Sequence, residues 1–154
     1  MDGVERVGDP AALVRENDVI SLHVPLNKET ENMLNREMFS HFKKGSYLIN
    51  TARAEIVDFD ALLEALEGGI LAGAAMDVFE GEFQKGFSGS PGFRAHPLLE
   101  YARNHDNLLL TPHIGGSTQD AWKKTEAHTL RRVIEYMNPG ASLPPGPGPS
   151  PSGA

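Results

Sequence analysis

Apolar residues in this sequence gather into short continuous runs, and a segment with helical spacing separates each run from the next. The runs lie at residues 18–25, 46–50, 70–79 and 108–110. Continuous apolar runs of this length are typical of strands that are buried on both faces of a parallel sheet. Strands that alternate with helices predict an α/β fold with right-handed crossovers.

Helix-capping residues mark the segments between and beyond these runs. Asp9 followed by Pro10 predicts the start of a helix over residues 11–16. Asp58 predicts the N-cap of a helix over residues 59–67, which a pair of glycines ends. Further helical segments are expected at residues 35–42, 97–101 and 118–137, and residues 80–96 are expected to form a long loop. In the last helix the residues expected to face a core are Trp122, Leu130, Val133, Ile134 and Met137.

The composition changes sharply after Asn138. Residues 139–154 are almost entirely Pro, Gly, Ser and Ala. Such a segment cannot bury enough apolar surface to offset the entropy of ordering it. We therefore predict one α/β domain over residues 1–138 and a disordered tail over residues 139–154.

Composition and charge exclude several classes of function. The formal net charge is −7 and the basic residues are scattered, so the sequence indicates no nucleic-acid surface. The sequence contains no cysteine, which excludes disulfides and thiol catalysis. No apolar run approaches a membrane span and no signal-peptide pattern is present, so we expect no membrane association and a cytoplasmic location. The histidines outside the motifs share no ligand spacing, so no metal site is expected; they are His41, His96, His105 and His128.

Three of the apolar runs lead into residues that can carry chemistry. Arg53 follows the second run, Asp77 lies in the third, and His113 follows the fourth. The carboxyl ends of parallel strands lie at one edge of a sheet, so these side chains can converge on one crevice. Arg53 can hold a carboxylate through two hydrogen bonds, and His113 can exchange a proton near neutral pH. Asp77 can accept a hydrogen bond from an amide of a ligand.

The surroundings of His113 leave some choices open. A carboxylate behind the imidazole would stabilise its charged form and fix its orientation; Glu80 or Glu82 can supply it, and their spacing does not choose between them. The two glycines after His113 remove side chains, so a flat ligand or a phosphate can approach the backbone there. Ser117 is also close in sequence, but no nucleophile elbow surrounds it, which disfavours a serine hydrolase.

Four segments taken together resemble the D-isomer-specific 2-hydroxyacid dehydrogenases, most closely their D-3-phosphoglycerate dehydrogenase branch. In chain order these segments are residues 18–26 (DVISLHVPL), 48–53 (LINTAR), 72–82 (AGAAMDVFEGE) and 108–118 (LLLTPHIGGST). The resemblance implies a Rossmann-like, doubly wound parallel sheet. It also implies an NAD-dependent oxidoreductase that converts a small 2-hydroxy acid to a 2-keto acid by hydride transfer.

The resemblance assigns roles to individual residues. It implies that Arg53 binds the substrate carboxylate, that Glu82 pairs with His113, and that His113 donates the proton when NADH reduces a 2-keto acid. It places Asp77 at the nicotinamide carboxamide. The implied cofactor-binding residues are His23, Val24, Pro25, Thr51, Ala52, Arg53, Asp77, His113, Gly115 and Gly116.

The sequence also departs from the family pattern. The glycine-rich dinucleotide fingerprint is absent, because Gly3 and Gly8 lack its spacing, and so is the acidic residue that follows it. The family's substrate-binding segment, which precedes the fingerprint, is absent too. Ala54 stands where a glycine is usual, and Phe83 where a proline is usual. We therefore expect the C-terminal half of a Rossmann-like domain, with the catalytic strand ends but without the pyrophosphate cradle.

Two functions remain open from the sequence. The first is an oxidoreductase module that is active only when a homo-oligomer or a partner chain supplies the other half of the domain. The second is a catalytically inactive remnant that serves as a binding or interaction module. The residues favour no particular 2-hydroxy acid, and the residue that selects NAD or NADP belongs to the fingerprint region.

Overall fold

The computed structural model describes residues 4–87 and 90–138. The chain forms two compact units, Met1–His113 and Ile114–Ala154, and each is described by itself. The tail expected over residues 139–154 lies outside the described residues. None of the described helices is long and apolar enough to cross a membrane.

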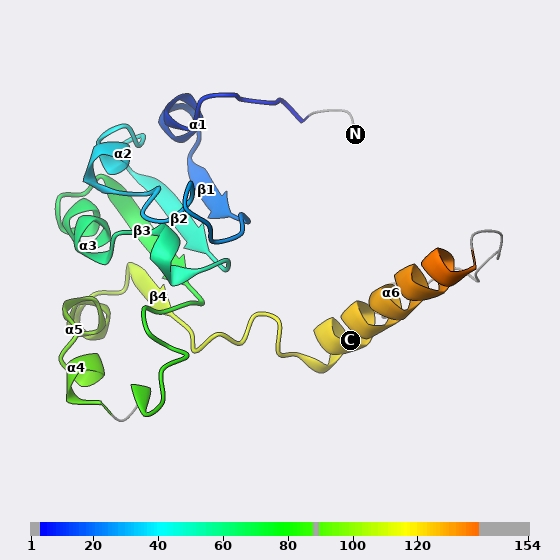
Figure 1. Ribbon diagram of the computed structural model, residues 1–154. Coiled ribbons are helices and arrows are strands. Elements are labelled where there is room, and N and C mark those ends of the chain that lie inside the picture. The colour runs from blue at the N-terminus through cyan, green and yellow to red at the C-terminus, as the bar shows by residue number, and fades with distance from the viewer. Residues whose placement is uncertain (1–3, 88–89, 139–154) are drawn as a thin grey trace, which may run out of the picture. The chain divides into compact units, whose positions relative to one another are not determined.

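The first unit is built on a four-stranded sheet with the order β1-β2-β3-β4 (Figure 1). Its strands are β1 (Val19–Leu22), β2 (Ser46–Asn50), β3 (Leu71–Met76) and β4 (Leu108–Leu110). Every neighbouring pair is parallel, which confirms the predicted α/β class and the parallel sheet. The strands lie in the sheet in the same order as in the sequence, because each crossover connection places the next strand beside the previous one in the same direction.

One helix precedes β1, and the others connect the strands on one face of the sheet. They are α1 (Pro10–Glu16), α2 (Arg36–Ser40), the 3-10 turn η1 (Ala54–Ile56), α3 (Phe59–Glu67), α4 (Pro91–Arg94) and α5 (Pro97–Asn104). Helix α3 packs against β3 and α5 packs against β4, while α2 and α5 flank α3. Asp9 and Asp58 cap α1 and α3 as predicted, with their carboxylates accepting from Ala11 N and Ala61 N at 3.0 Å. The segment expected as a continuous loop contains α4, which Ser90 caps and Pro91 begins.

The two faces of the sheet differ in burial. On the helix-covered face Ile20, Leu48 and Met76 are buried, whereas on the other face Val19, Tyr47 and Leu109 are all at least half exposed. The expectation that the strands are buried on both faces is therefore wrong for this unit. A continuous apolar run shows that both faces of a strand are apolar, and it does not show that an element covers each of them.

The second unit contains helix α6 (Gln119–Met137), which Thr118 caps by accepting from Ala121 N at 3.1 Å. No residue of α6 is buried. The expectation that its apolar side chains face a core is therefore wrong, because the described residues of this unit give α6 no other helix or strand to pack against. The residues concerned are Trp122, Leu130, Val133, Ile134 and Met137.

Candidate active site

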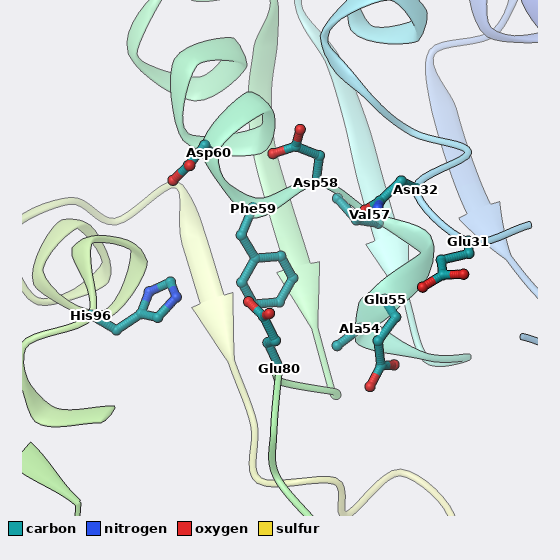
Figure 2. Close-up of a pocket in the computed structure, with 10 residues that line it drawn as sticks. All are labelled: Glu31, Asn32, Ala54, Glu55, Val57, Asp58, Phe59, Asp60, Glu80 and His96. Atoms are coloured by element: carbon teal, nitrogen blue, oxygen red, sulfur yellow. The ribbon is translucent and has the colours of Figure 1, made fainter. Parts of the chain in front are cut away.

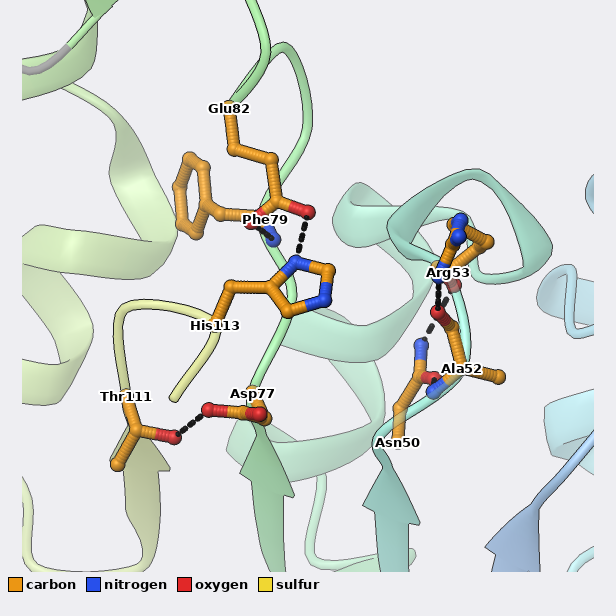
Figure 3. Close-up of polar contacts among 8 residues, drawn as sticks. All are labelled: Asn50, Ala52, Arg53, Asp77, Phe79, Glu82, Thr111 and His113. Carbon is orange, nitrogen blue, oxygen red and sulfur yellow. Dashed lines mark hydrogen bonds and ion pairs between the residues drawn. The ribbon is translucent and has the colours of Figure 1, made fainter. Parts of the chain in front are cut away.

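Main-chain hydrogen bonds hold three strand ends side by side at the carboxyl edge of the sheet. Asp77 N donates to Asn50 O at 2.9 Å, and Thr111 N donates to Met76 O at 3.0 Å. The parallel hydrogen-bond pattern of the sheet thus continues for one residue beyond the ends of β3 and β4. The segments that carry Arg53, Asp77 and His113 consequently begin from one aligned edge (Figure 3).

Asn50 fixes the turn that leads to Arg53. Its side chain is fully buried at the end of β2. The amide Nδ2 donates to Arg53 O at 2.8 Å, and the amide oxygen Oδ1 accepts from Ala52 N at 2.9 Å. One side chain therefore satisfies a donor and an acceptor of the turn, which a buried backbone requires.

Arg53 is exposed, with an extended backbone just before η1. Its Nη1 donates to the carbonyl oxygen of Ala52 at 2.6 Å. This contact uses one of the five N–H donors of the guanidinium, so the group keeps donors enough to bind a carboxylate bidentately. Figure 3 shows the guanidinium on the side of the site that the imidazole of His113 faces.

A tight turn presents His113. His113 N donates to Thr111 O at 3.0 Å, a two-residue spacing that places Pro112 at the centre of a γ-turn. The fixed φ of proline suits this position. His113 itself has a φ of 53°, in the left-handed region that side chains other than those of Asn, Asp and His rarely adopt. Such backbone strain is typical of functional sites and turns the imidazole back over the sheet edge.

Glu82 holds the imidazole of His113. Oε1 of Glu82 accepts from His113 Nδ1 at 2.7 Å, and Oε2 accepts from Phe79 N at 3.3 Å. Of the two carboxylates that the sequence left open, Glu82 is thus the one in contact with the ring, whereas Glu80 is exposed and lines a different hollow. An ionised carboxylate only accepts, so Nδ1 carries the hydrogen and Nε2 is the atom that can exchange a proton.

Asp77 lies at the floor of the site. It is only 8% exposed, and its Oδ1 accepts from the hydroxyl of Thr111 at 2.5 Å. This hydrogen bond ties the residue after β3 to the residue after β4. The carboxylate is thereby held at the sheet edge, beneath the imidazole in the view of Figure 3.

The remaining residues implied for cofactor binding lie at different places. His23 follows β1 and is exposed, and its Nε2 shares a hydrogen bond of 2.8 Å with Ser21 Oγ. Val24 is half-buried, and Pro25 O accepts from the hydroxyl of Thr30 at 2.7 Å. Thr51 is exposed and Ala52 half-buried beside Arg53. The other two, Gly115 and Gly116, belong to the second unit and are exposed.

A separate hollow of about 370 Å³ is strongly acidic (Figure 2). Its carboxylates belong to Glu31, Glu55, Asp58, Asp60 and Glu80. Within residues 4–87 and 90–138, no three His, Cys, Asp or Glu side chains come together as a metal-binding group. The negative charge of this hollow disfavours an anionic ligand there.

Sequence reasoning missed two residues that hold the site together. Asn50 and Thr111 position the Arg53 turn and Asp77, yet neither was assigned a role. The available signal was a polar residue at the end of an apolar strand, because a buried polar side chain there needs hydrogen-bond partners.

Known proteins resemble this chain in sequence. Residues 2–115 match the family model described as "D-isomer specific 2-hydroxyacid dehydrogenase, NAD binding domain". The chain is 42% identical to D-3-phosphoglycerate dehydrogenase of Escherichia coli over 131 residues, which is 85% of this chain and 30% of that protein. It is 39% identical to glyoxylate reductase of Thermofilum pendens over 137 residues, or 89% of this chain and 36% of that protein. The chain thus spans about a third of the length of these relatives.

Solved structures show the same similarity. A D-lactate dehydrogenase from Aquifex aeolicus, crystallised with NAD and lactic acid, matches with a TM-score of 0.69 and 37% identity. That match covers 90% of this chain and 45% of the other. D-2-hydroxyisocaproate dehydrogenase matches with a TM-score of 0.70 and 28% identity, over 91% of this chain and 45% of the other.

Proposed function

Since this chain belongs to the D-isomer-specific 2-hydroxyacid dehydrogenase family and matches part of its NAD-binding domain, we propose that it supplies the catalytic residues of an enzyme that interconverts 2-hydroxy and 2-keto acids. The observation that carries this proposal is the Glu82–His113 pair, held at the same sheet edge as Arg53. An imidazole oriented by a carboxylate suits proton transfer, and a guanidinium suits a carboxylate substrate.

The residues at this edge fit the nicotinamide end of NAD. Asp77 is a buried carboxylate at the end of a parallel strand, where open α/β sheets bind their ligands, and it can accept from the carboxamide. Thr51 and Ala52 lie at the neighbouring strand end. The sequence contains no G-x-G-x-x-G, so these residues account for the nicotinamide and not for the pyrophosphate. Held by these residues, the nicotinamide of NAD would supply the acceptor for the hydride from C2 of the hydroxy acid, and that of NADH would supply the hydride for the reverse reaction.

The chain's own residues perform the remaining steps. Arg53 binds the carboxylate of the substrate and orients its C2 oxygen toward His113. In reduction of the keto acid, Nε2 of His113 donates a proton to that oxygen; in oxidation of the hydroxy acid, Nε2 removes it. Glu82 keeps the hydrogen on Nδ1 and stabilises the charged imidazole that the oxidation produces.

A second candidate function is a catalytically inactive interaction module that needs a partner chain or a second copy. The open face of the sheet, with Val19, Tyr47 and Leu109 exposed, favours this candidate. The two functions differ in one respect that can be measured: only the first requires His113 to transfer a proton.

A chimera tests the proposed function. This chain replaces the matching segment of Escherichia coli D-3-phosphoglycerate dehydrogenase, and NADH oxidation is followed with several 2-keto acids. We expect turnover that falls by about 10²–10⁴-fold in His113→Asn, the usual contribution of a positioned acid or base. Arg53→Gln is expected to raise KM most. A folded chimera that binds NADH without turnover would favour the interaction module.

A further inference from the structure

A second cavity adjoins the Glu82–His113 pair. It has a volume of about 350 Å³, which lies within the range of about 300–1,000 Å³ seen for small-molecule sites. Apart from the pair, its walls are mainly apolar and include Phe79, Phe83, Phe87, Phe93, Leu99 and Leu110. In Figure 3 the ring of Phe79 lies on the opposite side of the Glu82 carboxylate from Arg53. Arg53 is not among the residues that line the cavity, so the cavity differs from the space between His113 Nε2 and Arg53 that the proposed substrate occupies.

The aromatic wall of this cavity is a packed cluster. The ring centroid of Phe93 lies 4.4 Å from that of Phe87 and 5.4 Å from that of Phe79. The Phe79 and Phe87 centroids are 5.8 Å apart. These spacings are those of tilted and edge-to-face aromatic pairs, so a further ring can join the cluster with the same geometry.

The cavity also reaches the imidazole. The ring centroid of Phe83 lies 5.6 Å from that of His113, and Phe83 is 76% exposed. Phe83 is the residue that stands where the family pattern has a proline. A ligand in the cavity would touch Phe83 and His113 together.

Hydrogen bonds already engage the polar groups on the walls. Both oxygens of Glu82 accept N–H groups of the protein, and the Thr111 hydroxyl donates to Asp77. No Lys or Arg lines the cavity. An anion would therefore find no counter-charge and would meet the carboxylate of Glu82. An ammonium group has three donors and would lose its hydration, and the one carboxylate in the lining, Glu82, already accepts two hydrogen bonds and offers only its remaining lone pairs.

We propose that this cavity binds an uncharged single-ring compound, aromatic or alicyclic, packed against Phe79 and Phe93 and in contact with His113. This binding site goes beyond the proposed function and does not depend on it. The bound ring excludes water from one side of the imidazole, so occupancy of the cavity is transmitted directly to the residue proposed to transfer the proton.

The test titrates the purified chain with benzyl alcohol and cyclohexanol, and in parallel with benzoate and benzylammonium. NMR follows the Leu methyl groups, the Phe rings and the His113 imidazole. We expect saturable shifts at Leu99, Leu110 and His113 with the two neutral probes. Dissociation constants should be on the order of millimolar, as for ligands of about eight heavy atoms. Equal or tighter binding of either charged probe overturns the proposal.

Three variants locate the site. Leu99→Trp fills the cavity and is expected to weaken benzyl alcohol binding at least tenfold. Phe83→Ala removes an exposed ring, which the fold does not need, and is expected to weaken binding several-fold while the circular dichroism spectrum stays unchanged. Leu109→Ala is the matched control, since Leu109 lies on the open face of the sheet and should leave binding as it was. Identical affinities in Phe83→Ala and Leu109→Ala, or no saturable shift with either neutral probe, refute the proposal.

Discussion

Nδ1 of His113 lies 2.7 Å from Oε1 of Glu82, although 31 residues separate the two in sequence. The Glu82 side chain is 14% exposed and that of His113 35%, so water competes only in part for this hydrogen bond. The second oxygen of Glu82 accepts from Phe79 N, which fixes the carboxylate in turn. The pair therefore presents Nε2 of the imidazole in a defined orientation before any ligand binds.

Replacing Glu82 by Leu should change the tautomer of His113. Without the acceptor, the hydrogen on Nδ1 loses its partner, and the neutral ring is expected to shift toward the form protonated at Nε2. The ¹⁵N chemical shifts of the imidazole measure this change. Glu80→Leu is the matched control, because Glu80 lies two residues away and does not contact the ring. A wild-type ¹⁵N pattern in Glu82→Leu would show that the carboxylate does not orient His113.

The Arg53 turn should depend on Asn50 for its stability. Asn50→Ala leaves both Ala52 N and Arg53 O without their partner in partly buried surroundings, which is expected to cost about 2–4 kcal/mol of unfolding free energy. Asn27→Ala is the comparison, because Asn27 makes the same kind of turn contact, to Glu29 N and Thr30 N, in an exposed loop. We expect that variant to lose about 1 kcal/mol or less. Urea unfolding followed by circular dichroism measures both losses. Equal losses would contradict the proposal that the two hydrogen bonds of the Asn50 side chain stabilise the Arg53 turn.

Local patterns in the sequence located several elements with their observed ends. The strands Ser46–Asn50 and Leu108–Leu110 and the helix Phe59–Glu67 have the predicted boundaries. Each is bounded by residues with a clear physical effect, such as the Asp58 cap or the Thr-Pro step after β4. The parallel arrangement also explains why residues far apart in sequence meet at one edge of the sheet.

Features that depend on the path of a loop or on a missing neighbour were not predictable. The spacing of Glu80 and Glu82 does not show which carboxylate reaches His113, because the turn at residues 79–82 decides it through the contact of Glu82 with Phe79 N. The burial of Tyr47 and Trp122 depends on what covers them. An apolar pattern predicts which side of an element is apolar but not which partner packs there.

The two faces of the sheet should respond differently to the same substitution. Leu48 is fully buried beneath the helices, and Leu109 is 61% exposed on the other face. Leu48→Ala is expected to cost about 2–5 kcal/mol, and Leu109→Ala less than about 1 kcal/mol. Urea unfolding measures both losses, because a shift of the midpoint at an unchanged dependence on urea concentration reports a change in unfolding free energy. A large loss in Leu109→Ala would show that the open face is covered in solution.

The Arg36–Glu64 pair should make stability depend on pH in the acid range. Two hydrogen bonds of 2.6 and 2.5 Å from Arg36 lower the pKa of Glu64 from its ordinary value of 4.5. Because the folded-state pKa is lowered, the stabilisation is full above pH 4.5 and is lost as the pH falls through the lowered value. The stability difference between wild type and Glu64→Gln should therefore be small and positive at pH 7 and become smaller as the pH falls below 4.5.

High salt is the independent check on that pair. Both side chains are more than half exposed, so 1 M NaCl should reduce the difference at pH 7. Thermal melts at pH 7, 5 and 3, each with and without salt, give the comparison. A difference between wild type and Glu64→Gln that is the same at every pH would mean that the pair does not contribute through its charge.

The 154-residue chain by itself is expected to self-associate. Strand β1 pairs only with β2 in the described sheet, so its outer edge keeps unpaired main-chain groups, and Val19 exposes apolar surface beside it. Such an edge is a template for pairing with a second chain. Light scattering over a range of concentrations should show species larger than a monomer. Val19→Lys, which places a charge at this edge, should shift the population toward the monomer, whereas Val4→Lys, outside the sheet, should not.

The same isolated chain is expected to show no measurable dehydrogenase activity. It contains the residues proposed for the nicotinamide side of the site, but the sequence provides no glycine fingerprint whose backbone amides and helix N-terminus would bind the pyrophosphate. The charged part of the cofactor then has little to hold it, so NADH binding should be weak even though Arg53, Glu82 and His113 are in place. NADH oxidation with pyruvate, glyoxylate and other 2-keto acids, measured alongside light scattering, tests this. Robust turnover by a monomer would refute it, and would mean that residues outside the fingerprint pattern bind the pyrophosphate.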